Sequence, residues 1–285
     1  MRMLSVVIGA VLLCPVVALG AESDSTQAGG TLPPYLRDRG TGVPTSMFGI
    51  YALPKQLIVY PFFEYYKDAN AEYSPQELGY TLDQDFRGEY EASEYLILLG
   101  YGLSDRVSLE FEVAAISAEL EKSPADTTAL PQELTESGLG DVQAQVNWMW
   151  QKETAHHPAF FSYAEVVFPT QKDYSLIGTS DWESLVGIGA IRGFSWGTIS
   201  LLASVEYEAA ENAFGLGEAA VQYLKRLSPT WSLFGSVEGK QDEWELITEA
   251  QFRFSRRAAL ILNSAVGLTS KAAGWAPEVG ILFTF

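Results

Sequence analysis

The chain has 285 residues, of which 47% are hydrophobic, and its 36 acidic and 18 basic residues give a net charge of −18 at pH 7. Such a charge would repel nucleic-acid phosphates, so the composition excludes nucleic acid as a partner. A single cysteine excludes a framework of disulfides. The acidity has two interpretations, because it either keeps an exported protein soluble or lines a functional surface.

Residues 1–20 have the features of a secretory signal peptide. Arg2 supplies the positive start, and an apolar stretch of about ten residues follows it. Ala18 and Gly20 place small residues where a signal peptidase cleaves. The apolar stretch is shorter than the roughly 20 residues that a membrane-spanning helix needs. We therefore predict that residues 1–20 are removed and that the protein is exported.

Residues 21–54 show no strand periodicity and are rich in Gly, Pro and Thr. One interpretation is a loose periplasmic leader, since terminal segments often lack fixed structure. The other is a partial plug of an acidic interior, because Arg37 and Arg39 would be strongly attracted to carboxylates at low dielectric. The sequence leaves both interpretations open.

From Lys55 onward, apolar and polar residues alternate in segments of strand length, separated by Gly, Ser, Pro, Asp or Asn. This alternation predicts about twelve strands. They are expected at 56–67, 90–101, 106–118, 140–151, 159–168, 182–192, 197–208, 217–226, 230–240, 244–254, 258–268 and 277–285.

The connections between these segments alternate in length. Several connections are short turns that contain an apolar residue followed directly by a serine, with the apolar residue at Leu103, Phe194, Leu227 or Phe254. The connections between these turns are generally longer and more acidic. An antiparallel barrel that crosses a membrane has short turns at one end and longer loops at the other. The 7 tryptophans lie near the ends of the expected strands, where indole is favoured at a bilayer interface. Residues 55–285 are therefore predicted to form an all-β, transmembrane, antiparallel up-and-down barrel.

Alternation also sorts side chains between lipid and lumen, because successive residues of a strand face opposite sides. Many carboxylates fall on the polar face, which predicts an acidic lumen that favours cations, as acidic rings do in cation channels. The alternative is that they pair with Arg226, Lys240 and Arg253 or hydrate a water-filled interior. The lumen-facing candidates are Glu64, Glu94, Glu110, Glu112, Asp141, Glu165, Glu206, Glu218, Glu238, Glu249 and Arg253. A barrel of about twelve strands should be narrow or partly plugged.

No catalytic constellation is present in the sequence. The 2 histidines, His156 and His157, both fall in an expected short turn, and no G-x-S-x-G motif occurs. We expect no enzymatic activity, no cofactor and no metal centre; the DQD stretch from Asp83 to Asp85 gives only a weak indication of divalent ions.

The chain ends on an alternating strand whose apolar face includes Phe283 and Phe285. We predict that Phe283 faces lipid and that Phe285 lies in the aromatic girdle at the periplasmic interface. This last strand should pair with the first, near Leu57 to Tyr66, because a barrel in lipid can leave no free edge.

Several segments of the sequence resemble a family of proteobacterial outer-membrane transporters known as the MetA-pathway of phenol degradation type. The segments that carry the resemblance are YGLSDRVSLEFEVA, ESGLGDVQAQVNWMW, VVFPTQ, WAPEVGILFTF and RDRGTGVPTSMFGIYALPKQLIVYPFFEYY. The resemblance implies passage of hydrophobic or aromatic compounds. It also implies that the C-terminal aromatic residue is recognised by the barrel assembly machinery.

The sequence thus predicts a channel or transporter for small molecules in the outer membrane of a Gram-negative bacterium. Its expected partners are membrane lipid, lipopolysaccharide, the barrel assembly machinery and a small-molecule solute. The alternative is a structural or surface-interaction barrel without conductance.

Overall fold

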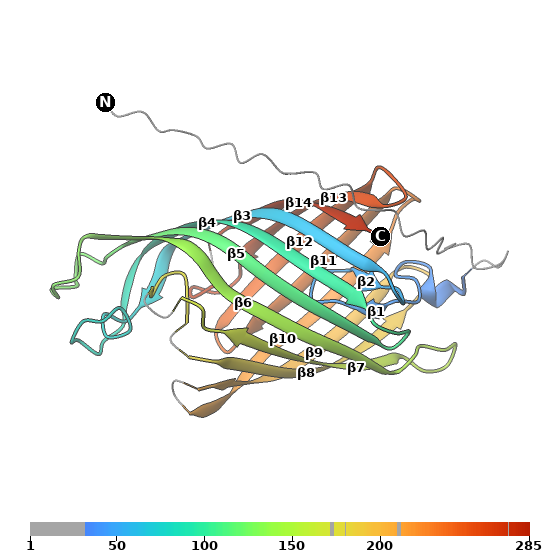
Figure 1. Ribbon diagram of the computed structural model, residues 1–285, viewed down its shortest axis with the longest axis horizontal. Coiled ribbons are helices and arrows are strands. Elements are labelled where there is room, and N and C mark those ends of the chain that lie inside the picture. The colour runs from blue at the N-terminus through green and yellow to red at the C-terminus, as the bar shows by residue number, and fades with distance from the viewer. Residues whose placement is uncertain (1–31, 172–173, 180, 210–211, 273) are drawn as a thin grey trace. The chain divides into compact units, whose positions relative to one another are not determined.

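The protein is a closed β-barrel (Figure 1). The computed structural model describes residues 32–171, 174–179, 181–209, 212–272 and 274–285, so the expected signal peptide lies outside the described residues. Twelve antiparallel strands each pair with the next in sequence, and the last pairs with the first. The strands are β3 (Leu57–Tyr73), β4 (Phe86–Gly102), β5 (Val107–Glu121), β6 (Glu133–Gln151), β7 (Ala159–Phe168), β8 (Glu183–Gly193), β9 (Thr198–Glu208), β10 (Ala213–Arg226), β11 (Trp231–Lys240), β12 (Glu243–Arg253), β13 (Ala258–Gly267) and β14 (Ala276–Thr284). The predicted fold class and strand number are confirmed.

The two faces of each strand differ as the alternation predicts. On β4, the inward Leu96 and Leu98 are 8% and 1% exposed, whereas the outward Tyr95 and Ile97 are 66% and 45% exposed. Other exposed outward residues are also apolar: Leu109, Phe111, Val186, Ile188, Leu201, Val205, Val221 and Leu262. An apolar surface that continues around the wall suits hydrocarbon rather than water.

The barrel has a short-turn end and a long-loop end, but the contrast is weaker than the sequence predicts. At the short-turn end lie the connections 103–106, 152–158, 194–197, 227–230 and 254–257. At the long-loop end, the connections 74–85, 122–132, 169–182 and 268–275 are long, but 209–212 and 241–242 are also short. The two-residue turn is possible because Gln241 adopts a positive φ of 49°.

Strands β3 to β6 are longer than predicted and project beyond the others at the long-loop end (Figure 1). The sequence predicted strands 56–67, 90–101, 106–118 and 140–151, and the boundaries of these strands at the long-loop end are wrong. A hydrophobic cluster centred on Tyr73, Phe86, Leu120 and Leu130 lies at this end, and its burial explains why the strands stay paired there.

Segment 32–54 lies at the short-turn end and packs against inward-facing side chains of the barrel. It contains a 3-10 turn, η1 (Pro34–Leu36), and a two-stranded sheet of β1 (Val43–Pro44) and β2 (Tyr51–Ala52). Val43 and Ala52 are completely buried. Met47 packs in the cluster of Tyr60, Phe62, Leu96, Leu98, Ala114 and Ile261. No helix among the described residues is long and apolar enough to cross a membrane.

The segment's backbone approaches the wall closely at two glycines. A Cβ on Gly193 would lie 1.8 Å from the carbonyl oxygen of Tyr35, and one on Gly102 would lie 1.9 Å from that of Leu53. Only glycine leaves room for such contacts, so these two positions fix where the segment enters and leaves the barrel end.

The closing seam joins β14 to β3, as predicted. Glu278 is the partner of Glu64, and Phe283 is the partner of Val59. Beyond β14, Phe285 and Leu57 exchange backbone hydrogen bonds of 2.9 and 3.0 Å. Phe285 is 61% exposed on the outside of the barrel.

Candidate functional site

A row of polar side chains crosses the inner wall in register over five neighbouring strands. Going from β12 to β4, each residue is the direct cross-strand partner of the next: Glu249, Asn263, Glu278, Glu64 and Glu94. We call this set the carboxylate row. Like charges directly opposite each other on one face destabilise a sheet. The row therefore costs folding stability unless something in the lumen compensates its charge.

A second acidic group lies further around the inner wall, on β5, which is paired with β4, and on β7. Glu110 accepts hydrogen bonds from the backbone N–H of Ser46, at 2.7 Å, from the Ser46 hydroxyl and from the Asn147 side chain. Glu112 and Glu165 lie near it on the same inner face, with Gln143 and Gln145 as their respective cross-strand partners. The tip of segment 32–54 is thus held in the lumen by one of the barrel's own carboxylates.

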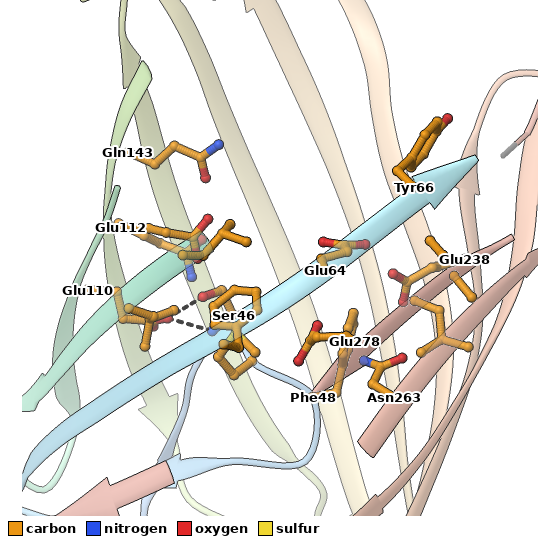
Figure 2. Close-up of a pocket in the computed structure, with 18 of the residues that line it drawn as sticks. Ser46, Phe48, Glu64, Tyr66, Glu110, Glu112, Gln143, Glu238, Asn263 and Glu278 are labelled. Carbon is orange, nitrogen blue, oxygen red and sulfur yellow. Dashed lines mark hydrogen bonds between the residues drawn. The ribbon is translucent and has the colours of Figure 1, made fainter. Parts of the chain in front are cut away.

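Between these walls lies a cavity of about 330 Å³. Figure 2 shows Ser46 and Phe48 between the wall of Glu110 and Glu112 and the wall of Glu278 and Asn263. The carboxylates that line it are Glu64, Glu110, Glu112, Glu165, Glu238, Glu245 and Glu278. The apolar lining includes Met47, Phe48, Phe62, Leu96, Leu98 and Ile247. Its size and its mixed lining are typical of small-molecule sites.

The ion pairs of the described residues lie at the two ends of the barrel, away from these carboxylates. Arg39 pairs with Glu153 at 3.0 Å at the short-turn end, and Lys240 pairs with Glu206 at 3.2 Å near the long-loop end. No ion pair among the described residues involves a carboxylate of the cavity or of the carboxylate row. Within the described part of the chain, the middle of the lumen is acidic without matching bases.

Glu249 has one carboxylate oxygen without a hydrogen-bond partner. Its Oε1 accepts a hydrogen bond of 2.6 Å from Gln251, whereas its Oε2 has none, although the residue is only 4% exposed. Gln251 also donates to the carbonyl of Phe48, which lines the cavity. A buried oxygen atom without a partner is costly, and native proteins seldom leave one without a functional reason.

Most of the lumen-facing candidates lie inside the barrel, but three have other surroundings than expected. Asp141 accepts hydrogen bonds from Thr170, Gln171 and Thr179 at 2.5–3.2 Å and so holds the loop 169–182. Glu206 pairs with Lys240, as the alternative interpretation predicts for it. Arg253 is the last residue of β12 and is exposed at the short-turn end. Glu218 also faces inward, and its carbonyl accepts a hydrogen bond of 3.0 Å from Ser204.

Two cavity carboxylates, Glu245 and Glu278, were not among the candidates. Glu245 shares the face of Glu249 on β12 and is the direct partner of Glu238 on β11. Glu278 alternates with lipid-facing residues of β14. The same alternation that identified the others could have identified both residues.

The plug candidates have different positions from those expected. Arg39 is buried, but its partner is Glu153 in the turn 152–158 rather than a carboxylate in mid-lumen. Arg37 is exposed. His156 and His157 lie in the same turn as Glu153, and both are exposed. Phe283 and Phe285 lie at the short-turn end of the closing seam.

Closure of twelve strands, an apolar outer face and tryptophans at strand ends define a transmembrane β-barrel. The fold is similar to that of the COG4313 outer membrane channel from Pseudomonas putida F1, with a TM-score of 0.60 at 15% sequence identity over 85% of this chain and 99% of that chain. The translocator domain of the autotransporter NalP from Neisseria meningitidis matches with a TM-score of 0.45 at 10% identity, over 81% and 88% of the two chains. No protein-family model and no curated protein matches the sequence. The fold thus resembles that of outer-membrane proteins of Gram-negative bacteria.

Proposed function

We propose that the protein is an outer-membrane channel for small molecules. The observation that carries the proposal is the cavity, which combines seven carboxylates with an apolar wall in the middle of the lumen. Carboxylates without matching bases in the described chain raise the local concentration of cations and repel anions. The apolar lining supports passage of molecules with a hydrophobic or aromatic part, in line with the family that the sequence resembles.

Segment 32–54 occupies the short-turn end of the lumen, so we propose that it narrows the channel. Its tip is held by Glu110 and by the contact of Phe48 with Phe234, whose ring centroids are 5.2 Å apart. Conductance is therefore expected to be small.

Single-channel recording in planar bilayers tests this function. We expect small current steps with more cation than anion flow in a salt gradient. The double variant E64Q/E278Q should lose part of this cation preference, because it removes two charges of the carboxylate row. E121Q, an exposed and outward-facing control of β5, should keep it. Absence of current over many insertions of correctly folded protein would support the alternative, a structural or surface-interaction barrel.

Membrane lipid, lipopolysaccharide and the barrel assembly machinery remain proposed partners. Deletion of Phe285 should greatly reduce the amount of folded protein in the membrane, because the last residue of the seam would no longer present its exposed ring during insertion. Once inserted, the variant should unfold at nearly the same urea concentration as the parent protein. Equal amounts of folded protein from both genes would contradict an assembly role.

A further inference from the structure

The cavity has two chemically different sides. Phe62, Leu96 and Leu98 form an apolar side with Met47 from segment 32–54, and these residues belong to one buried cluster. Glu64 and Glu278 lie next to that cluster in the carboxylate row. A molecule that fills about 330 Å³ would therefore contact apolar side chains and carboxylates at the same time.

The acidic side accepts hydrogen bonds and offers few donors. Glu64 and Glu278 are direct cross-strand partners that both line the cavity, and neither forms an ion pair with a described residue. In the carboxylate row, the only side chain that carries N–H donors is that of Asn263. A ligand for this side must therefore bring its own N–H donors and a positive charge.

A bare metal ion does not fit this arrangement. Among the described residues, no group of three or more His, Cys, Asp or Glu side chains comes close enough together to bind one. The carboxylates of the row belong to different strands, and neighbouring strands are about 4.8 Å apart, so the charges are spread along the wall. An ammonium group needs fewer ligands, because it can be held by the neighbouring pair Glu64 and Glu278 while an attached apolar body contacts the rest of the wall.

We propose that the cavity binds small organic ammonium ions that have an apolar or aromatic body, a class of solute that the channel would then pass. The proposal rests on the proposed function for the transport step, whereas binding itself does not require conductance. The ammonium group would donate to Glu278 and Glu64, which are direct cross-strand partners and both line the cavity. The body would pack on Phe62, Leu96 and Leu98, and the ring of Phe62 would add cation–π attraction.

Three probes of nearly equal size test the proposal: benzylammonium, benzyl alcohol and benzoate. Binding to the purified full-length barrel in detergent can be measured by calorimetry. Because hydrogen bonds to charged groups are the stronger ones, benzylammonium should bind about tenfold or more tightly than benzyl alcohol, and benzoate should bind most weakly. Benzylammonium added to a bilayer should also reduce the sodium current at concentrations where benzyl alcohol has no effect.

Variants assign the effect to the two sides of the cavity. E64Q and E278Q should each weaken benzylammonium binding about tenfold and leave benzyl alcohol binding unchanged. L98A should weaken both probes, because it shortens the apolar side. E121Q serves as the charge-matched control, and a heating-dependent shift in electrophoretic mobility checks that each variant is folded.

The outcomes separate this proposal from the proposed function. Equal affinity for benzylammonium and benzyl alcohol, or equal affinity of E64Q, E278Q and the parent protein for benzylammonium, would overturn the ammonium site even if the barrel conducts ions. A silent barrel that nevertheless binds benzylammonium selectively would keep the site and refute the channel.

Discussion

The short-turn end and the middle of the lumen differ in how their buried charges are compensated. At the short-turn end, Arg39 and Glu153 have side chains that are 2% and 0% exposed, and they pair at 3.0 Å. Glu153 also accepts a hydrogen bond of 2.9 Å from the backbone of Gly193 and lies 3.5 Å from Arg192. In mid-lumen, the carboxylate row places like charges opposite one another without a described basic partner.

The difference separates charges that hold the structure from charges that are free for a solute. A buried charge is costly unless it is paired and hydrogen-bonded, and Glu153 meets both conditions. The mid-lumen carboxylates do not meet the first condition. Because they lower stability where they stand, a role in binding or conduction explains them better than a structural one.

The first prediction concerns a variant that breaks the ion pair between Arg39 and Glu153. R39M should destabilise the docking of segment 32–54 by about 3–5 kcal/mol, because it leaves the Glu153 carboxylate buried without its main counter-charge. The effect should appear as fast proteolysis of this segment in folded protein. R37M changes an exposed arginine two positions away and should leave the segment protected. Equal protection of both variants would show that the ion pair does not hold the segment.

The second prediction tests the contribution of backbone packing, rather than of charge, at the short-turn end. G193A should cost about 1–3 kcal/mol, since its Cβ would fall 1.8 Å from the Tyr35 carbonyl oxygen and force the backbone apart. Gly215 has no atom within 4 Å of the corresponding position, so G215A is the matched control. Urea unfolding and proteolysis of the segment measure both. A tolerated G193A would mean that Tyr35 can move away freely.

The third prediction concerns a variant that removes the negative charge of Glu64, which has no basic partner among the described residues. E64Q should stabilise the barrel by about 0.2–1 kcal/mol, because Glu64 lies between its partners Glu278 and Glu94 on one face. E206Q should have the opposite sign, since Glu206 forms an ion pair with Lys240. The urea midpoints of the two variants are compared with that of the parent. A lower midpoint for E64Q would show that its charge is already compensated.

The smallest expected effect concerns a solvent-exposed pair at the long-loop end. Asp242 accepts a hydrogen bond from Lys271, with a separation of 2.9 Å, and this bond lowers the pKa of the Asp242 carboxyl. The contribution of the pair is therefore present above the unfolded-state pKa of about 3.9 and is lost as the pH falls through the lower folded-state value. D242N should speed amide exchange in the loop 268–275 slightly at pH 7. At a pH below both pKa values, the variant and the parent should exchange alike.

The sequence predicted the inner face better than the contacts made across it. Glu64, Glu110 and Glu249 were placed in the lumen because each alternates with apolar neighbours on its own strand. The partner of Arg39 could not be predicted, because the acidic lumen offered many carboxylates and no pattern distinguishes Glu153 in a turn. The use of Asp141 to hold a loop was missed for the same reason, since loop conformation depends on packing that has no period.

The amino-acid sequence by itself determined the class of fold, the number of strands, the two faces and the closing seam. These follow from a period of two residues and from the need to pair every backbone N–H and C=O in lipid. Only the tertiary structure decided which side chains meet. The register at the seam sets Glu278 beside Glu64, and the entry of segment 32–54 sets Ser46 against Glu110. Both depend on how a closed wall aligns residues far apart in the chain, which no local pattern encodes.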